Sequence, residues 1–182
     1  MTTSYAVLLR GINVGGRRKV PMAALREVLG GLGHDDVRTH LQSGNAVFRS
    51  AQGDERTLRA GIEAALLERF GFEVGCVVRD AAYLRAVVDA CPFDADALEG
   101  RQLHVTYVSE PVDPERFAGL DAAAYLPDEF RLGDRAVYLY APDGVGRSKL
   151  AVVLGRPALF PGSVATSRNW NTVVKLVELT HG

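Results

Sequence analysis

The hydrophobic pattern begins with a continuous apolar run at residues 5–9, which is typical of a central strand covered on both faces. Apolar residues then recur at helical spacing over residues 22–32, directly after Pro21, a residue that suits the first turn of a helix. Alternation over residues 37–41 and the apolar run that starts at Ala46 predict two further strands, joined by a turn.

Two more elements complete the first half of the chain. A helix is predicted by four apolar residues spaced four apart: Leu58, Ile62, Leu66 and Phe70. Gly71 ends this helix, and residues 72–79 form another strand. The resulting order, β-α-β-β-α-β, is the ferredoxin-like pattern, in which the sheet order is 4-1-3-2 and the first strand is central. Helices cover one face of such a sheet, so we expect the rest of the chain to cover the other.

The second half repeats this organisation approximately. Asp80 can cap a third helix that ends at Pro92, and residues 93–100, rich in Asp and Ala, are a candidate linker. Beyond the linker the pattern predicts a strand at 101–109, a helix start at 113–115, a hairpin of 129–132 and 135–140, a helix at about 147–154, and a helix or strand at 167–179. We therefore expect an α+β fold of two ferredoxin-like subdomains packed together, residues 1–92 and 101–182.

Composition limits the cellular setting. No apolar run in the 182 residues approaches the roughly 20 residues that span a bilayer, and the N-terminus lacks the apolar stretch of a signal peptide. We expect a cytoplasmic protein that does not enter a membrane. Cys76 and Cys91 lie on apolar segments, which indicates reduced, buried thiols rather than a disulfide framework.

The net charge of −1 conceals an uneven distribution. Residues 1–49 carry seven basic and three acidic side chains, residues 50–143 carry nine and eighteen, and residues 144–182 carry five and one. Basic ends therefore flank an acidic middle. Two interpretations remain open: the ends form a local positive binding site, or they pair with the acidic middle across the fold.

The loop over residues 10–21 contains three glycines, four cations and no acid. Gly11 and Gly16 have the spacing of a phosphate-binding loop, but Arg17 and Arg18 follow where a nucleotide triphosphatase needs Lys and then Ser or Thr. The helix at Pro21 also begins too late to direct its N-terminus into the loop. These departures argue against a P-loop enzyme and leave a more general hypothesis, an anion held by backbone N–H groups and cations.

Topology predicts what lies beside this loop. In a ferredoxin-like unit the first and second strands run parallel, so the loop after the first strand and the turn after the second emerge at the same edge. Asn13 and the turn at Gly15 and Gly16 should therefore lie near residues 42–45, a Gln-Ser-Gly-Asn turn. That would gather amides, a hydroxyl and cations on one rim.

Two clusters in the second half have a similar character. Residues 146–149, Gly-Arg-Ser-Lys, place a hydroxyl and two cations at a helix start, where free N–H groups favour anions. Residues 166–172, Thr-Ser-Arg-Asn-Trp-Asn-Thr, do the same for the terminal element, with Ser167 or Thr166 as its N-cap. Trp170 fits an inward anchor better than a base-stacking residue.

These motifs predict a protein that binds an anionic or phosphate-containing ligand: a nucleotide, a phosphorylated metabolite or a short single-stranded nucleic acid. The expected ligand-binding residues are Arg10, Asn13, Gly15, Gly16, Arg17, Lys19, Ser43, Asn45, Ser148, Lys149, Arg168 and Asn169. No metal site, cofactor or catalytic residue is predicted, because the histidines and cysteines lack ligand spacing. Two alternatives stay open: an enzyme acting on a phosphate-containing substrate, or purely structural hydrogen-bond networks that include Arg10 and Asn171. A homo-oligomer is compatible with either.

Four stretches, LLRGINVGG with KVPM, QSGNAVF, GRSKL and TSRNWNTVVKL, together resemble the family of proteins of unknown function numbered 1697 (DUF1697). The resemblance spans nearly the whole chain. It implies an α+β fold of two ferredoxin-like subdomains, and it assigns no activity, substrate or catalytic residue.

Overall fold

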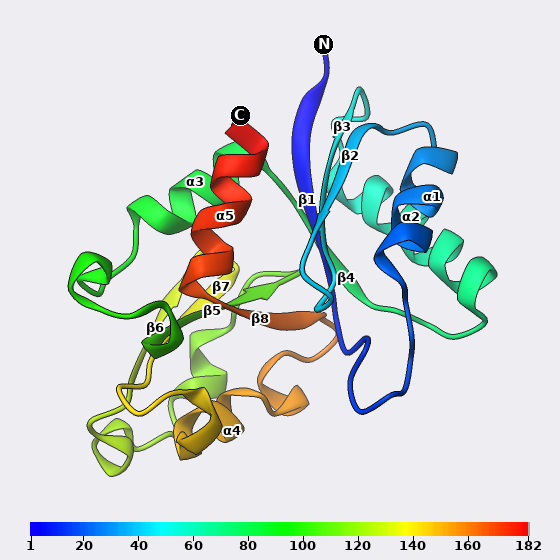
Figure 1. Cartoon of the computed structure of the whole chain (residues 1–182). Helices are drawn as coiled ribbons and strands as arrows, with labels where there is room; N and C mark the ends of the chain where they lie inside the picture. Colours follow the sequence, from blue (N-terminus) through cyan, green and yellow to red (C-terminus); the bar gives the residue numbers. More distant parts are fainter. Residues whose placement is uncertain (182) are drawn as a thin grey trace. The chain divides into compact units, whose positions relative to one another are not determined.

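The structure, a computed structural model, describes residues 1–181. Within them the chain forms a mixed α+β fold with two four-stranded antiparallel sheets and five α-helices (Figure 1). Two compact units are present: the first unit comprises Met1–Arg85 and the residues from Leu176 onward, and the second unit comprises Ala86–Lys175. The chain passes from one unit to the other within helix α3 (Ala81–Asp89) and again within helix α5 (Trp170–His181). The expected linker at residues 93–100 contains a short 3-10 helix, Ala95–Ala97.

The sheet of the first unit has the order β2-β3-β1-β4, the 4-1-3-2 order expected from the sequence. Its strands are β1 (Thr3–Leu9), β2 (Asp35–His40), β3 (Asn45–Ser50) and β4 (Cys76–Asp80). Strand β1 is central and pairs antiparallel with β3 and β4. Because β2 also pairs antiparallel with β3, strands β1 and β2 run parallel, as predicted.

Helices α1 (Met22–Gly31) and α2 (Glu55–Phe70) cover one face of this sheet (Figure 1). Alternate residues of each strand face them, and these strand residues join apolar residues of both helices in one buried core. Pro21 stands immediately before α1 rather than inside its first turn. Helix α2 is capped by the Asp54 carboxylate, which accepts from Arg56 N–H at 3.1 Å, and ends at Gly71 with a left-handed φ of 77°.

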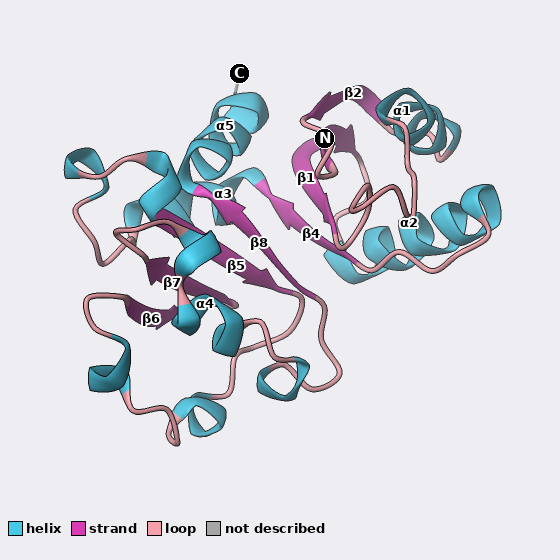
Figure 2. Cartoon of the chain, turned by 60° about the horizontal axis from the view of Figure 1, so that its bottom comes forward, coloured by secondary structure: helices cyan, strands magenta, loops and turns pink. Residues whose placement is uncertain are grey.

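The second unit has the same strand order, β6-β7-β5-β8. Its strands are β5 (Leu103–Val108), β6 (Glu129–Gly133), β7 (Ala136–Tyr140) and β8 (Ala165–Asn169). Figure 2 shows loops and short helices, rather than long helices, connecting these strands. The predicted helix start after Asp113 is a 3-10 helix, Pro114–Phe117, and helix α4 (Lys149–Leu154) has six residues. The unit therefore echoes the first in topology but not in its helices.

The segment predicted as either helix or strand at residues 167–179 contains both. Strand β8 ends at Asn169 and helix α5 begins at the next residue. The expected N-cap, Ser167 or Thr166, is therefore wrong: the Asn169 side chain accepts from Thr172 N–H at 3.0 Å. The β-branched residues that suggested a strand instead lie on a helix whose apolar face is buried, because tertiary packing overrides their weak intrinsic preference.

Candidate functional site

The loop between β1 and α1 folds back on itself as a small hairpin. Arg17 N–H donates to the Val14 carbonyl at 3.0 Å, and Asn13 N–H donates to the Arg18 carbonyl at 3.1 Å. Gly15 and Gly16 occupy the tip with φ of 59° and 74°, values that glycine adopts without steric cost. The glycines therefore form a defined turn rather than a flexible cradle.

Asn13 closes this hairpin and joins it to the turn between β2 and β3. Its side-chain amide donates to the Val20 carbonyl at 3.0 Å and to the Gln42 carbonyl at 2.7 Å, and its oxygen accepts from Val20 N–H at 2.8 Å. The predicted proximity of Asn13 to the turn at residues 42–45 is thus present. Since both amide hydrogens and the oxygen are engaged, Asn13 positions the loop.

Arg18 anchors the other side of the loop. Its Nε donates to the Gly11 carbonyl at 3.0 Å, another N–H donates to the Glu73 carbonyl, and the guanidinium lies 5.1 Å from the centre of the Phe72 ring. Arg17 and Arg18 are both among the four cations of this loop, but they differ in how they hold it: Arg17 through its backbone N–H and Arg18 through its side chain.

Gly44 lets the two loops approach closely. Its φ is 93°, and a Cβ built there would lie 2.7 Å from Ile12 Cδ1 and 2.9 Å from Leu9 Cβ. Leu9 N–H also donates to the Gly44 carbonyl at 2.8 Å. A side chain at residue 44 would therefore force the loop after β1 away from the turn.

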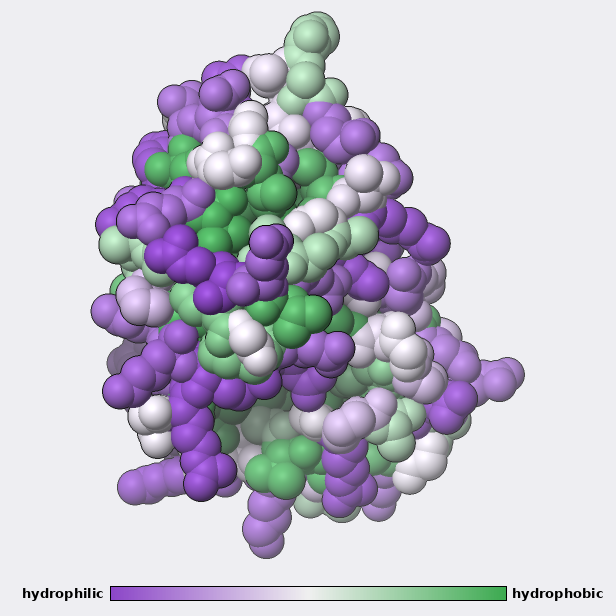
Figure 3. Space-filling model, turned by 90° about the vertical axis from the view of Figure 1, so that its right-hand side faces the viewer, coloured by the Kyte–Doolittle hydropathy of each residue, from purple (hydrophilic) through white to green (hydrophobic). Residues whose placement is uncertain are grey.

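A cavity of about 350 Å³ opens between the two loops. We call it the rim pocket, and its lining residues are Asn13, Gly16, Lys19, Pro21, Met22 and Gln42. Lys19 is the charged residue in this lining, which contains no carboxylate. Val14 and Leu41, in the adjoining turns, are 67% and 55% exposed, so apolar surface borders the pocket. Figure 3 shows one face of the molecule, on which separate hydrophobic patches lie among hydrophilic side chains.

The cations of the opening loop divide into two kinds. Arg10, Arg17 and Lys19 are exposed and make no ion pair within residues 1–181, whereas Arg18 is held by carbonyl groups. For these three residues the idea that the basic ends pair with the acidic middle does not apply. Their charge is available to a ligand.

Ser43 and Asn45 both belong to the neighbouring turn, but their side chains differ in solvent exposure. Asn45 is fully buried, and its amide donates to the His40 carbonyl at 2.8 Å and to Ser43 Oγ at 3.2 Å. Its side chain therefore fixes the turn beneath the rim, while Ser43 is exposed.

The predicted cluster at residues 146–149 belongs to the second unit and is not free of acid in space. Ser148 Oγ donates to Asp128 Oδ2 at 2.6 Å and accepts from Ala151 N–H at 3.0 Å, so this buried hydroxyl caps α4. Asp128 lies 20 residues earlier in the chain, which is why inspection of the local motif missed it. Lys149 is exposed at the helix start.

Arg168 and Asn169 also lie in the second unit and are engaged there. Arg168 is 7% exposed and donates to Thr166 Oγ1 at 2.6 Å and to the Ser167 carbonyl at 2.9 Å. Burial lowers the pKa of its guanidinium to about 10. A buried guanidinium cannot meet a ligand from solvent without a rearrangement, and Asn169 is exposed but caps α5.

Three further features bear on the chemistry of the chain: the buried thiol of Cys76, the grouping of possible metal ligands and the character of the helices. Burial raises the pKa of the Cys76 thiol, which keeps it protonated and unreactive. Within residues 1–181 no three His, Cys, Asp or Glu residues are grouped so that they could hold a metal ion. None of the helices in this part of the chain combines the length and apolar character needed to cross a bilayer.

Comparison with known families supports the resemblance noted in the sequence. The sequence model of the family described as "Protein of unknown function (DUF1697)" matches residues 1–138. The chain belongs to the DUF1697 family. The matched part of this DUF1697 protein contains the whole loop after β1 and the turn between β2 and β3, while the motifs at residues 146–149 and 166–172 lie beyond it.

Solved structures give the same picture of the fold. The conserved bacterial protein SP0830 from Streptococcus pneumoniae is similar over 100% of both chains, with a TM-score of 0.80 and 20% sequence identity. This similarity concerns the fold of the DUF1697 chain alone. A comparison with curated protein sequences finds no match.

Three residues of the rim pocket were not predicted as ligand-binding residues. Pro21, Met22 and Gln42 line it together with the predicted Asn13, Gly16 and Lys19. Pro21 and Met22 were assigned only to the helix start and its apolar face, and Gln42 only to the neighbouring turn. The closeness of Pro21 and Met22 to Lys19 in the chain is the signal that could have placed them in the pocket.

Proposed function

We propose that the rim pocket binds a nucleotide, with its phosphate near Lys19 and its base against the apolar side of the pocket. The observation that carries this proposal is the cavity of about 350 Å³, lined by one cation, two amide side chains and two apolar side chains without a carboxylate. Pockets of roughly 300 Å³ or more accommodate small organic ligands.

The charge of the rim favours the phosphate. Lys19 lines the pocket, and Arg10 and Arg17 are exposed on the same loop. Because none of the three is engaged by a carboxylate within residues 1–181, each keeps its charge for a ligand. A hydrogen bond from a cation to phosphate is about twice as strong as a bond between neutral groups.

The apolar part of the rim favours a nucleotide over a sugar phosphate. Pro21 and Met22 form an apolar wall, and Val14 and Leu41 leave more apolar surface exposed beside the pocket. A planar base would bury this surface, and burial of apolar area is favourable by about 25 cal/mol per Å². The Gln42 side chain offers an amide for the edge of the base.

Binding of adenosine monophosphate, ribose 5-phosphate and adenosine, measured by isothermal titration calorimetry, tests this proposal. We expect adenosine monophosphate to bind more tightly than either fragment. Replacing Lys19 by Gln should weaken the two phosphate-containing probes about tenfold, since a charge-assisted bond contributes on the order of 1.5–3 kcal/mol. The same variant should leave the affinity for adenosine nearly unchanged.

Lys149→Gln is the matched control, because Lys149 is an exposed lysine of the second unit. Gln42→Ala should weaken adenosine and adenosine monophosphate but not ribose 5-phosphate. The absence of saturable binding for all three probes would refute the proposal. An equal effect of Lys19→Gln and Lys149→Gln would show that binding is nonspecific.

A structural role remains the second candidate for part of the motifs, and specific observations favour it. Asn13, Asn45 and Asn169 each satisfy backbone groups. Asn171 lies against Gly100, where a built Cβ would be 2.3 Å from its side-chain oxygen. Under this reading, Asn13→Ala lowers the free energy of unfolding even in the absence of ligand.

We also infer that each unit is a variant of the ferredoxin-like fold. The strand order of both sheets and the parallel arrangement of β1 and β2 support this inference. In the second unit a 3-10 helix replaces the first crossover helix. Such an arrangement accounts for the rim, since it brings the ends of β1 and β2 to the same edge.

A further inference from the structure

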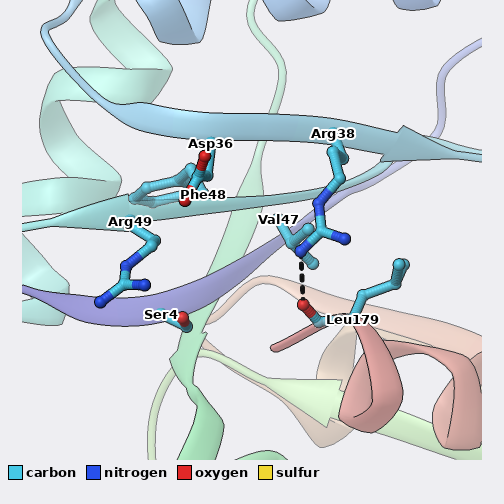
Figure 4. A pocket seen from close by; sticks show the side chains of 7 residues that line it. All are labelled: Ser4, Asp36, Arg38, Val47, Phe48, Arg49 and Leu179. Carbon is cyan, nitrogen blue, oxygen red and sulfur yellow. Dashed lines mark hydrogen bonds between the residues drawn. The ribbon is translucent and has the colours of Figure 1, made fainter. Parts of the chain in front are cut away.

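A second, smaller cavity lies on the first sheet, away from the rim pocket. It has a volume of about 30 Å³, and its lining residues are Ser4, Asp36, Arg38, Val47, Phe48, Arg49 and Leu179 (Figure 4). None of these residues lines the rim pocket. Any ligand of this cavity is therefore independent of the nucleotide proposal.

Strand pairing brings two arginines to the same side of this sheet. Arg38 is paired with Val47, and Arg49 is paired with Ser4. Because Val47 and Arg49 are two residues apart on β3, their side chains emerge on the same face, and Arg38 joins them across the strands. Figure 4 shows both guanidinium groups projecting from neighbouring strands around the cavity.

Each guanidinium retains most of its hydrogen-bonding capacity. Arg38 donates to the Leu179 carbonyl at 2.8 Å, and Arg49 donates to Thr2 Oγ1 at 2.9 Å. A guanidinium has five N–H donors, so several on each arginine are left for a ligand. The Ser4 hydroxyl, which is half-buried in the lining, makes no hydrogen bond within residues 1–181.

The charges around the cavity are not balanced. Two guanidinium groups face it with one carboxylate, that of Asp36, and Asp36 forms no ion pair with either arginine. Asp36 is brought to this place by an irregularity of β2, where the register with β3 shifts between Asp35 and Arg38 and the φ of Asp36 is 48°. Two guanidinium groups on one face, against the single carboxylate of the lining, favour an anion between them.

We propose that this cavity binds a small oxyanion, the head of a phosphate or carboxylate group, between Arg38 and Arg49. Arginine is suited to this role because its planar fork meets two oxygen atoms of an oxyanion at once. Since a water-sized group needs about 10–15 Å³, a cavity of about 30 Å³ has room for two oxygen atoms. The rest of the ligand therefore extends into solvent, and Ser4 donates a third hydrogen bond.

The site also contacts the C-terminal helix. Arg38 holds the Leu179 carbonyl in the last turn of α5, where the helix dipole favours a cation. A bound oxyanion and this helix end therefore share one guanidinium. Amide signals from both β2–β3 and the residues near Leu179 should respond when the oxyanion binds.

Nitrogen-15 NMR titrations of the full chain with inorganic phosphate and with acetate test the proposal. We expect saturable shifts at Ser4, at residues 36–38 and 47–49 and around Leu179, with sodium chloride at matched ionic strength as the control. Arg38→Gln and Arg49→Gln should each weaken binding at least tenfold. Arg49→Lys keeps the charge but loses the fork, so it should weaken binding less than Arg49→Gln.

Asp36→Asn gives the opposite expectation. Removing the carboxylate from the lining should tighten binding about threefold, because a like charge no longer repels the anion. The rim variant Lys19→Gln should leave these titrations unchanged. A preference for phosphate identifies a phosphate-bearing ligand, and an equal response to acetate identifies a carboxylate as sufficient.

Shifts that do not saturate, or that persist unchanged in the folded Arg38→Gln and Arg49→Gln variants, would overturn the proposal. Weaker binding in Asp36→Asn would overturn it as well, since no loss of repulsion could then be involved. A thermal melt of each variant shows whether it is folded. Asp36→Asn and Arg49→Lys keep the test decisive if an Arg→Gln variant fails to fold.

Discussion

In both units the fourth strand ends with a buried arginine and an Asp or Asn that caps the next helix. Arg79 and Asp80 precede α3, where Asp80 Oδ1 accepts from Tyr83 N–H at 2.8 Å. Arg168 and Asn169 precede α5, where Asn169 accepts in the same way at 3.0 Å. The geometry is repeated although the surrounding sequences are not.

The equivalence extends to the central strands. Arg79 is paired with Ala6 on β1, and Arg168 is paired with Val105 on β5. The partners of the two arginines differ, however. Each donates to the carbonyl of the preceding residue at 2.9 Å. In addition, Arg79 lies 3.9 Å from the Glu55 carboxylate and 5.1 Å from the centre of the Tyr83 ring, whereas Arg168 donates to the Thr166 hydroxyl.

The helices differ even more than the arginines. The core of the first unit rests on α1 and the 16-residue α2, while that of the second unit uses 3-10 turns and the six-residue α4. The two sheets therefore share their strand order although different elements cover them. Variants placed at matched positions in the two units can measure how far this independence goes.

The largest expected effect comes from removing one buried leucine from each core. Leu66 of α2 and Leu150 of α4 are 0% and 1% exposed. We expect Leu66→Ala to lower the free energy of unfolding by about 4 kcal/mol and Leu150→Ala by about 2–3 kcal/mol. The six-residue α4 can shift to fill its cavity more readily than the 16-residue α2. Urea denaturation measures both losses, and a larger loss for Leu150→Ala would contradict this reasoning.

The two buried arginines give the next effect. Arg79→Met breaks an ion pair and leaves Glu55 without its cation, so we expect a loss of about 2–3 kcal/mol in the free energy of unfolding. Arg168→Met removes the bonds to the Thr166 hydroxyl and the Ser167 carbonyl, which are neutral acceptors, so a smaller loss of about 1 kcal/mol is expected. The double variant Arg79→Met with Glu55→Gln should recover part of the first loss. Equal losses at the two arginines would mean that their different partners do not matter.

One histidine in each unit, His34 in the first and His104 in the second, should make stability depend on pH to a different extent. Burial lowers the pKa of His104, and its Nδ1 is buried with no hydrogen-bond partner within residues 1–181. Burial also lowers the pKa of His34, which stacks on Phe48 at 4.4 Å, but the Asp35 carboxylate opposes that shift. In the unfolded chain both titrate near 6.5.

Because the folded pKa lies below the unfolded value, the unfolded chain takes up protons first as the pH falls. Stability is therefore complete above about pH 6.5 and is lost as the pH falls through the folded pKa. We expect His104→Gln to remove part of the loss between pH 7 and 5, and His34→Gln to remove less because the Asp35 carboxylate opposes its shift. Urea denaturation at several pH values measures the two slopes. An unchanged slope in His104→Gln would show that folding does not shift the pKa of this histidine.

Local pattern and connection order account for what the sequence predicted correctly. The apolar run at β1 and the alternation in β2 identified these segments as strands. The order of strands and helices along the chain then predicted the sheet order and the meeting of Asn13 with the turn at residue 42. A hairpin turn predicted at residues 133–134 lies one residue later, since Gly133 pairs with Ala136. Boundaries of this kind depend on local side-chain contacts that spacing does not reveal.

Contacts between distant residues account for what the sequence could not supply. Asp128 beside Ser148, the burial of Arg168 and the Arg38–Leu179 hydrogen bond join positions separated in the chain or hidden by packing. A motif free of acid in sequence is therefore not necessarily free of acid in space. The meeting of the two loops at the rim was predicted correctly, because it follows from strand direction.

The smallest expected effect concerns the residues that end α2 and α4. Both helices end at glycine, but Gly71 has a left-handed φ of 77°, whereas Gly155 has an ordinary φ of −82°. A Cβ at Gly71 would meet nothing within 4 Å, and one at Gly155 would meet the Ala151 and Val152 carbonyls at 3.5 Å, an ordinary contact. Gly71→Ala should therefore cost about 1 kcal/mol through backbone strain alone.

Gly155→Ala has the opposite sign. Its backbone already suits alanine, so the substitution mainly reduces the freedom of the unfolded chain and should stabilise the protein by about 0.4–1 kcal/mol. Thermal melts of the two variants and of the wild type decide the matter. If Gly155→Ala destabilised the protein as much as Gly71→Ala, the short α4 would be less tolerant at its end than α2. The inference that the covering helices can change without a cost to the sheet would then not hold at residue 155.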